Sequence, residues 1–303
     1  MGLSLSYIRL LAREHRRKPL VGPVLTLGRQ AVHGTLDQIR AALQSEGIAV
    51  WDDAAPAMRA TAVSSSPSGL VGQLGVDQAV FRLLGLESFA LDVSDYEGAE
   101  YIADLNQAIP HSLEEQFGTI IDGGTVEHVF DVKQAMQNIA RMLAVGGRVV
   151  HISPACNWLG HGFYQFSPTL FFDYYGINGF ADLRCFILEV RRSSMRDKVQ
   201  HACRCWEWDV RRPYSVILSS DALMSVFFAE KIPGATYEKV PQQGDFSAVG
   251  GGGRTLAPGA ASQDGLAGRI KRALPVELRQ FVNRALGRDL TRAPWGLRYL
   301  GRV

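Results

Sequence analysis

The stretch that decides the fold runs from Phe117 to Ser153 and reads FGTIIDGGTVEHVFDVKQAMQNIARMLAVGGRVVHIS. Its first six residues are rich in β-formers and end before two glycines, which predicts a buried strand followed by a turn. Residues 127–144 show helical periodicity, and Gly146-Gly147 then separate this helix from a second apolar run, Arg148–Ser153. A strand, a crossover helix and a second strand predict two parallel neighbours in one sheet.

The same alternation continues on both sides of this stretch. We expect strands and helices at the following places: strands at 24–28, 88–94, 100–105, 184–191 and 214–220, and helices at 3–17, 35–47, 76–85 and 221–231. Helices of this length between strands imply right-handed crossovers. The sequence therefore predicts an α/β fold with a mainly parallel, Rossmann-like sheet and flanking helices.

Charge and composition divide the chain into a body, a linker and a tail. Residues 1–241 form the predicted α/β body, with 48–75 as an insertion, and 242–265 form a Gly-rich linker. Residues 266–303 carry nine Arg/Lys and two Asp/Glu, a net charge of +7, whereas the rest of the chain carries −5. We expect a basic helical tail that contacts an anionic membrane surface or a protein, with no nucleic-acid partner.

Localisation and metal content follow from what the sequence contains. No apolar run reaches the ~18 residues that a membrane span needs, and the N-terminal residues lack the pattern of a signal peptide, so we expect a cytoplasmic protein, peripheral to the membrane if the tail binds lipid. Four cysteines fit a reduced compartment better than a disulfide framework. The Cys203-x-Cys205 spacing is too short for a usual zinc site, even with Cys156 and His201 nearby, so no metal is expected.

The central stretch resembles the fourth strand, crossover helix and fifth strand of class I S-adenosylmethionine-dependent methyltransferases. Glu127-His128-Val129 and Val145–Arg148 stand where that family has an "EHV"-like helix start and a glycine turn. The resemblance extends from Pro23 to Pro168. It implies that Asp92 binds the cofactor's ribose and that Asp104 flanks its adenine.

The resemblance also implies a cofactor loop after the first strand, at Gly28, and ligand contacts at Asp122-Gly123. The family has a Gly-x-Gly-x-Gly loop there, because glycine lets backbone N–H groups approach the cofactor closely. This chain has GRQAVHG instead, and Arg29 and Gln30 bring bulk into that space. The alternative is therefore a non-catalytic Rossmann-like binding or scaffold protein that has lost the cofactor. Asp122 has an alternative role as well, satisfying the N–H groups of its own turn.

Residues 153–176, SPACNWLGHGFYQFSPTLFFDYYG, follow the predicted fifth strand. Ligands of open α/β sheets bind beyond the carboxyl ends of strands, so we expect His161 and Tyr164 to line the site. His161 is the candidate general base; the alternative is a histidine bonded to backbone in a tight loop. A similar GHGFYQFSP stretch occurs in methyltransferase-like proteins of polysaccharide pathways. The resemblance thus implies methyl transfer to a hydroxyl-bearing, glycan-related or small-molecule acceptor, while Glu127-His128 are expected to have a structural role.

Overall fold

The computed structural model describes residues 2–51, 75–95, 97–190, 203–210, 217, 219–244 and 297–303. Most of the predicted insertion, most of the linker, most of the strand predicted at 214–220 and the tail up to residue 296 lie outside these residues.

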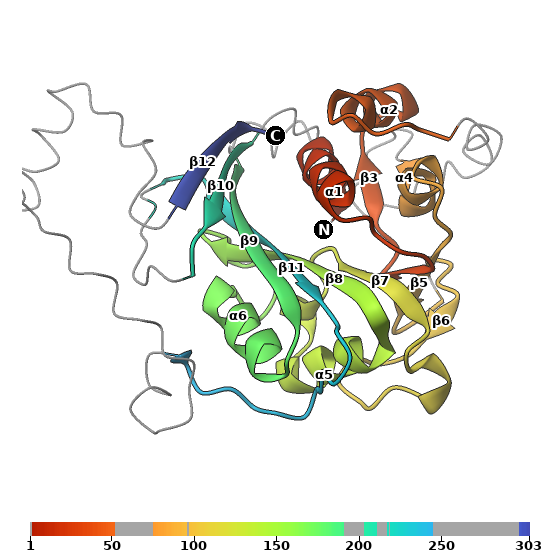
Figure 1. Ribbon diagram of the computed structural model, residues 1–303, viewed down its shortest axis with the longest axis vertical. Coiled ribbons are helices and arrows are strands. Elements are labelled where there is room, and N and C mark those ends of the chain that lie inside the picture. The colour runs from red at the N-terminus through yellow and green to blue at the C-terminus, as the bar shows by residue number, and fades with distance from the viewer. Residues whose placement is uncertain are drawn as a thin grey trace, which may run out of the picture.

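A nine-stranded sheet forms the centre of the molecule (Figure 1), in the order β12-β10-β9-β11-β8-β7-β2-β5-β6. Its strands are β2 (Val24–Leu27), β5 (Ser88–Asp92), β6 (Tyr101–Ile102), β7 (Phe117–Asp122), β8 (Leu143–Cys156), β9 (Ala181–Val190), β10 (Arg204–Trp208), β11 (Ala222–Glu230) and β12 (Leu297–Arg302). From β6 to β8 all neighbours are parallel, and from β8 to β12 all neighbours are antiparallel. The α/β class is confirmed, but the sheet is mixed and not mainly parallel.

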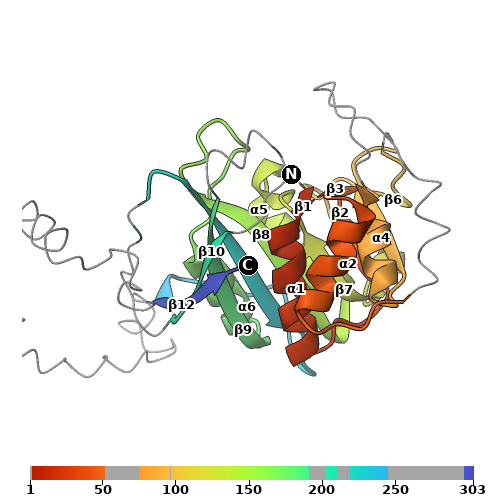
Figure 2. The same ribbon diagram turned by 90° about the horizontal axis from the view of Figure 1, so that it is seen from above.

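Helices cover both faces of this sheet. In Figures 1 and 2, α1 (Leu5–Arg17), α2 (Leu36–Ser45) and α4 (Asp77–Leu83) lie on one face, and α5 (Val132–Met142) and α6 (Pro168–Ile177) lie on the other. The buried side chains form two clusters, one on each face of the sheet. β7 is buried along its whole length because helices cover both faces of the sheet. Its sequence therefore lacks the alternation of polar and apolar residues that a half-exposed strand shows.

The segment between β2 and α2 departs from the usual strand-to-helix turn. Ala31–His33 form β3, which pairs with β1 (Gly2–Ser4) and β4 (Gly75–Val76) in a separate three-stranded sheet. Thr35 then caps α2 with its side chain, and Gln38 completes a capping box. The helix that follows β2 therefore begins at a distance from the end of that strand.

Two predicted helices are corrected. Residues 221–231 were expected to be helical, but Ala222–Glu230 form β11 between β8 and β9. The helix predicted at 127–144 is split into a 3-10 turn, η3 (Val126–His128), and α5, which Asp131 caps by accepting a hydrogen bond from the Gln134 N–H. A further 3-10 turn, η2, spans His111–Leu113.

The end of the predicted tail belongs to the body. β12 pairs with β10 along Arg204–Trp208, and Val303 is 1% exposed. The Ser6 hydroxyl donates to the Val303 carbonyl at 2.8 Å. Residues 297–303 are therefore an edge strand of the sheet, and the prediction of a separate helical module does not hold for them.

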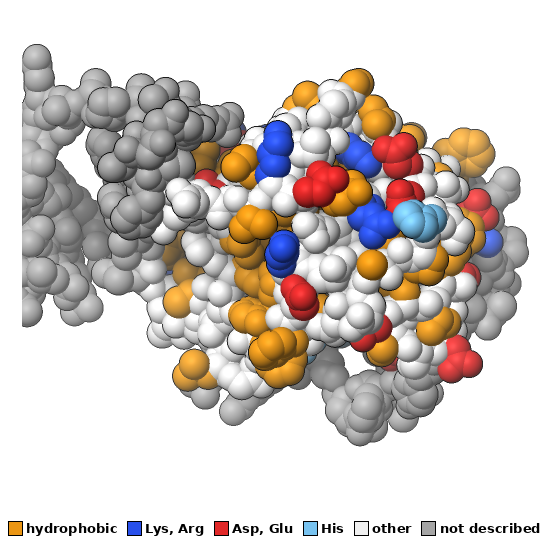
Figure 3. Space-filling model, turned by 90° about the horizontal axis from the view of Figure 1, so that it is seen from below, with side chains coloured by type: hydrophobic (Ala, Val, Ile, Leu, Met, Phe, Trp, Pro, Cys, Tyr) orange, Lys and Arg blue, Asp and Glu red, His pale blue; other side chains and the backbone are white. Residues whose placement is uncertain are grey.

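Neither a membrane-spanning helix nor a broad patch of one charge is seen among the described residues on the face drawn in Figure 3. No helix among the described ranges is long and apolar enough to cross a membrane. On the face drawn in Figure 3, basic and acidic side chains lie interspersed with apolar ones.

Candidate functional site

The carboxyl ends of β2, β5 and β7 meet at Gly28. The chain turns there with φ +72°, and the Gly28 N–H donates to Leu91 at the end of β5, at 2.7 Å. A Cβ on Gly28 would lie 3.6 Å from both Asp92 Oδ2 and Thr125 Oγ1. The parallel neighbours β5 and β7 lead away from β2 on opposite sides, so this is the switch point at which open α/β sheets bind ligands.

Asp92 and Asp104 lie at the carboxyl ends of adjacent parallel strands, as the sequence predicts. Asp92 is the last residue of β5 and pairs in register with Ile102 at the end of β6, two residues before Asp104. Asp92 is half-buried, and its Oδ1 accepts a hydrogen bond from the Val93 N–H at 2.6 Å. Asp104 is exposed, and hydrogen bonds from Asn106 lower its pKa. The structure thus brings Gly28 and Asp92 together and places Asp104 farther out on the same edge.

Arg29 and Gln30, the two bulky residues of the loop after β2, point in different directions. Arg29 turns away from the switch point, where it forms ion pairs with Asp77 at 3.3 Å and Glu100 at 2.7 Å. Gln30 is 3% exposed, and its Nε2 donates to the carbonyls of Leu27 and Gly28 at 2.7 and 3.2 Å.

Gln30 also covers Gly123, which was expected to contact the cofactor. A Cβ on Gly123 would lie 2.3 Å from Gln30 Oε1, so the amide packs directly against that backbone. The Gln30 side chain therefore fills the space between the ends of β2 and β7.

Asp122 bonds the N–H groups of its own turn, which is the alternative role that the sequence offers. Its carboxylate is fully buried and accepts hydrogen bonds from the N–H groups of Thr125 and Val126 at 2.9 and 3.2 Å. Its other oxygen lies 2.8 Å from His151 Nδ1, and His151 Nε2 lies 2.7 Å from the Tyr175 hydroxyl. This buried chain joins β7, β8 and α6, and its sequence signal was one histidine within the apolar run of β8.

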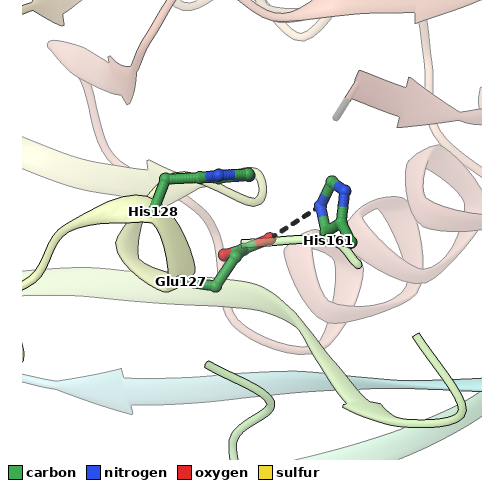
Figure 4. A group of neighbouring side chains, drawn as sticks. All are labelled: Glu127, His128 and His161. Carbon is green, nitrogen blue, oxygen red and sulfur yellow. Dashed lines mark ion pairs between the residues drawn. The ribbon is translucent and has the colours of Figure 1, made fainter. Parts of the chain in front are cut away.

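A second group of polar side chains lies where the loops after β7 and β8 meet (Figure 4). Glu127 is on η3, and His161 comes from the loop after β8; His161 Nε2 lies 3.5 Å from Glu127 Oε1. The rings of His128 and His161 are 4.8 Å apart, edge to face. One ligand atom from each of these three residues lies within 4.8 Å of the others. Sequence reasoning chose His161 but gave Glu127 and His128 only a structural role.

Burial sets the electrostatics of this group. Glu127 is fully buried, and burial, followed by the nearby Asp122 carboxylate, raises its pKa to about 8. Burial lowers the pKa of His161, and the neighbouring His128 lowers it further. Neither carboxylate oxygen of Glu127 has a hydrogen-bond partner among the described residues.

The GHGFYQFSP loop is clamped onto η3. The N–H groups of Phe163 and Tyr164 both donate to the Glu127 carbonyl, at 2.8 and 3.3 Å. The Tyr164 hydroxyl donates to the Phe130 carbonyl at 2.9 Å, and its ring stacks on Phe166. Tyr164 therefore helps to hold the loop in place beside Glu127.

Gly162→Ala tests this clamp. Gly162 has φ +67°, and a Cβ would lie 2.8 Å from the Glu127 carbonyl oxygen. Gly160 is the matched control, because its φ is +74° but a Cβ there meets nothing within 4 Å. We expect Gly160→Ala to lower the free energy of unfolding by about 1 kcal/mol, and Gly162→Ala to lower it by at least about 1 kcal/mol more. Urea unfolding curves measure both, and equal losses would mean that the loop does not pack against η3.

Cys203, Cys205 and a surface pocket belong to neither of these groups. Cys203 and Cys205 are buried thiols, and burial raises the pKa of Cys205 to about 12; His201 is outside the described residues. A surface pocket of about 500 Å³ lies at the start of β5, between Trp51, Arg82 and Phe89, and neither Gly28 nor His161 lines it.

Comparisons with known proteins give matches to solved structures only. No family model matches the chain, and no curated protein matches it. A SAM-dependent methyltransferase from Archaeoglobus fulgidus matches at 12% identity over 74% of this chain and 94% of its own, with a TM-score of 0.36. The 1,6-didemethyltoxoflavin-N1-methyltransferase of Burkholderia thailandensis, solved with S-adenosylhomocysteine, matches at 11% identity over 75% and 79%, with a TM-score of 0.30.

The chain also matches the CMeT domain of the citrinin polyketide synthase, at 12% identity and a TM-score of 0.34. That match covers 52% of this chain and spans only 42% of the length of that structure. In this chain β6, β5, β2, β7 and β8 lie in the 3-2-1-4-5 order of doubly wound sheets. The functional proposals below rest on the geometry of the site.

Proposed function

We propose that this chain is a methyltransferase-like protein that uses S-adenosylmethionine to methylate a hydroxyl group of a small-molecule or glycan acceptor. One observation carries the proposal: Asp92 lies beside Gly28 at the switch point of the sheet. A carboxylate in this position can accept hydrogen bonds from ribose hydroxyls, as in other nucleotide-binding α/β folds.

The residues at the switch point fit the nucleoside part of the cofactor. Gly28 has no Cβ, so a ligand can approach the backbone next to Asp92. Asp104, farther out on the same edge, is available to an adenine ring because it is exposed. On the other side of Gly28, the Gln30 side chain must swing out before the rest of the cofactor has room.

The remaining groups have separate tasks. The bound cofactor supplies an electrophilic methyl group on a sulfonium. His161 is partly exposed, and its Nε2 faces the buried Glu127 carboxylate at 3.5 Å, so this imidazole is the candidate base for the proton of an acceptor hydroxyl. The clamp between Tyr164, Phe163 and η3 fixes the direction in which His161 points, and methyl transfer depends on such alignment.

The second candidate is a non-catalytic Rossmann-like binding protein. It is favoured by Gln30, whose buried amide fills the space between the ends of β2 and β7. Under this proposal the fold and the aromatic loop serve to bind a partner, and no cofactor enters.

Calorimetric titration with S-adenosylhomocysteine separates the two candidates. We expect the wild-type chain to bind it and Asp92→Asn to weaken binding roughly 10- to 100-fold, since hydrogen bonds to a charged group contribute about 1.5–3 kcal/mol. His111→Ala is the control, because that imidazole is exposed and pairs with Glu114 away from Gly28; its effect is expected to be under about threefold.

Gln30→Ala completes this experiment. Without the amide, the space beside Gly123 is open, so affinity for S-adenosylhomocysteine is expected to rise. If neither the wild-type chain nor the Gln30→Ala variant binds, the non-catalytic alternative is correct. If Asp92→Asn binds as tightly as the wild type, the ribose assignment is wrong.

A further inference from the structure

We propose that Glu127, His128 and His161 bind one divalent transition-metal ion, for which Zn²⁺ is the test case. The inference goes beyond the proposed function, since methyl transfer to a hydroxyl group needs no metal, and it assigns chemistry to two residues that were expected to be structural.

The spacing of the three ligand atoms suits a single ion. Zinc binds nitrogen and oxygen ligands at about 2.0–2.2 Å, so two ligands of one ion lie at most about 4.4 Å apart. His161 Nε2 and Glu127 Oε1 are 3.5 Å apart, already within this limit. No two of the three ligand atoms are more than 4.8 Å apart, so the exposed His128 ring has to move by only about 0.4 Å to meet this limit.

The buried carboxylate of Glu127 is the observation that favours a bound cation. Glu127 is fully buried, and both of its oxygens lack a hydrogen-bond partner among the described residues. A buried carboxylate without compensation is costly, and the nearby Asp122 carboxylate has the same charge. A divalent ion held between Glu127 and His161 compensates this charge directly.

The backbone holds Glu127 in this position. Its carbonyl accepts the N–H groups of Phe163 and Tyr164, and Gly162 packs against its Cγ, where a Cβ would come within 2.9 Å. Glu127 and His161 are therefore fixed to each other through their backbones as well as through their side chains, which is the preorganisation that a metal site requires.

The donor set and its exposure indicate which ion binds and what it does. Two imidazoles and one carboxylate suit zinc, iron(II) or cobalt better than magnesium or calcium, which prefer oxygen ligands. Three protein ligands leave a coordination position open for water or a ligand. A water molecule or hydroxyl group bound at that position becomes more acidic, and while the ion is bound His161 is a ligand and not the general base of the proposed function.

Metal binding to the full-length chain tests the site directly. After treatment with a chelator, the wild-type protein is expected to bind one Zn²⁺ in calorimetry, with a dissociation constant on the order of micromolar or below. Glu127→Gln, His128→Ala and His161→Ala should each weaken binding roughly tenfold or more. His111→Ala is the control, because that imidazole is exposed and pairs with Glu114 outside the group.

Two further readouts distinguish the site from other ligands and from the proposed function. Co²⁺ should give a d–d spectrum of nitrogen and oxygen ligands without a thiolate charge-transfer band, which excludes the cysteines. Zn²⁺ should raise the melting temperature of the wild type and not of Glu127→Gln, a variant that folds without the buried charge. Equal Zn²⁺ affinity of the wild type, Glu127→Gln and His161→Ala, or no binding at all, overturns the inference. Neither result depends on S-adenosylhomocysteine binding, which Asp92 tests separately.

Discussion

Replacing Asp122 with alanine is expected to lower the free energy of unfolding by about 3–5 kcal/mol, because it removes one partner from a buried polar network. The carboxylate accepts the N–H groups of Thr125 and Val126 and contacts His151 Nδ1 at 2.8 Å. Asp122 and His151 are both fully buried, so water cannot take over these hydrogen bonds in the variant.

Asp104→Ala is the control for this prediction, because Asp104 is exposed and its carboxylate bonds only Asn106 among the described residues. Chemical unfolding followed by circular dichroism measures both variants. Asp122→Asn, which keeps an acceptor oxygen, should lie between the wild type and the alanine variant. A loss of less than about 1 kcal/mol for Asp122→Ala would show that the network does not hold the turn after β7.

Deleting residues 297–303 is expected to destabilise the body by at least about 4 kcal/mol, because it removes an edge strand together with buried apolar contacts. β12 pairs with the whole of β10, and the N–H and carbonyl groups of Val303 pair with Cys203. Leu297 and Val303 are buried, and Trp206 on β10 is 2% exposed beneath this edge.

Arg298→Ala is the matched control, since Arg298 is on β12 but is mostly exposed and pairs with Glu207 at the surface. It should change stability by less than about 1 kcal/mol. Thermal unfolding of both variants measures the difference. If the deletion leaves the melting curve unchanged, the end of the chain is dispensable, as a separate tail module would require.

β11 shows why local pattern could not decide every element. Its residues form a continuous apolar run, which a buried strand and a short buried helix share. In the structure, alternate residues face opposite cores: Met224, Val226 and Phe228 pack on one side, and Leu223 and Phe227 on the other. The run is a strand because β8 and β9 hydrogen-bond it on both sides, and both neighbours are distant in sequence.

The two groups of the candidate site also differ in how far their contacts could be predicted from sequence. Gly28 and Asp92 could be placed together from sequence, because each ends an apolar strand and parallel neighbours end at one edge. Glu127 and His161 could not, because their contact depends on the path of the loop after β8 and on the positive φ of Gly162. The position of Gln30 over Gly123 could not be predicted from sequence either, because it depends on how the chain enters β3.

The sequence by itself determined the α/β class and the strands β2, β5, β7 and β8, since apolar runs and glycine turns act over a few residues. The family resemblance implied that Asp92 lies near Gly28. The tertiary structure alone decided that half of the sheet is antiparallel, that β12 joins its edge and that Asp122 is buried. It alone brought the buried Glu127 carboxylate together with His128 and His161. These features depend on pairing and burial between residues far apart in the chain, which no local pattern encodes.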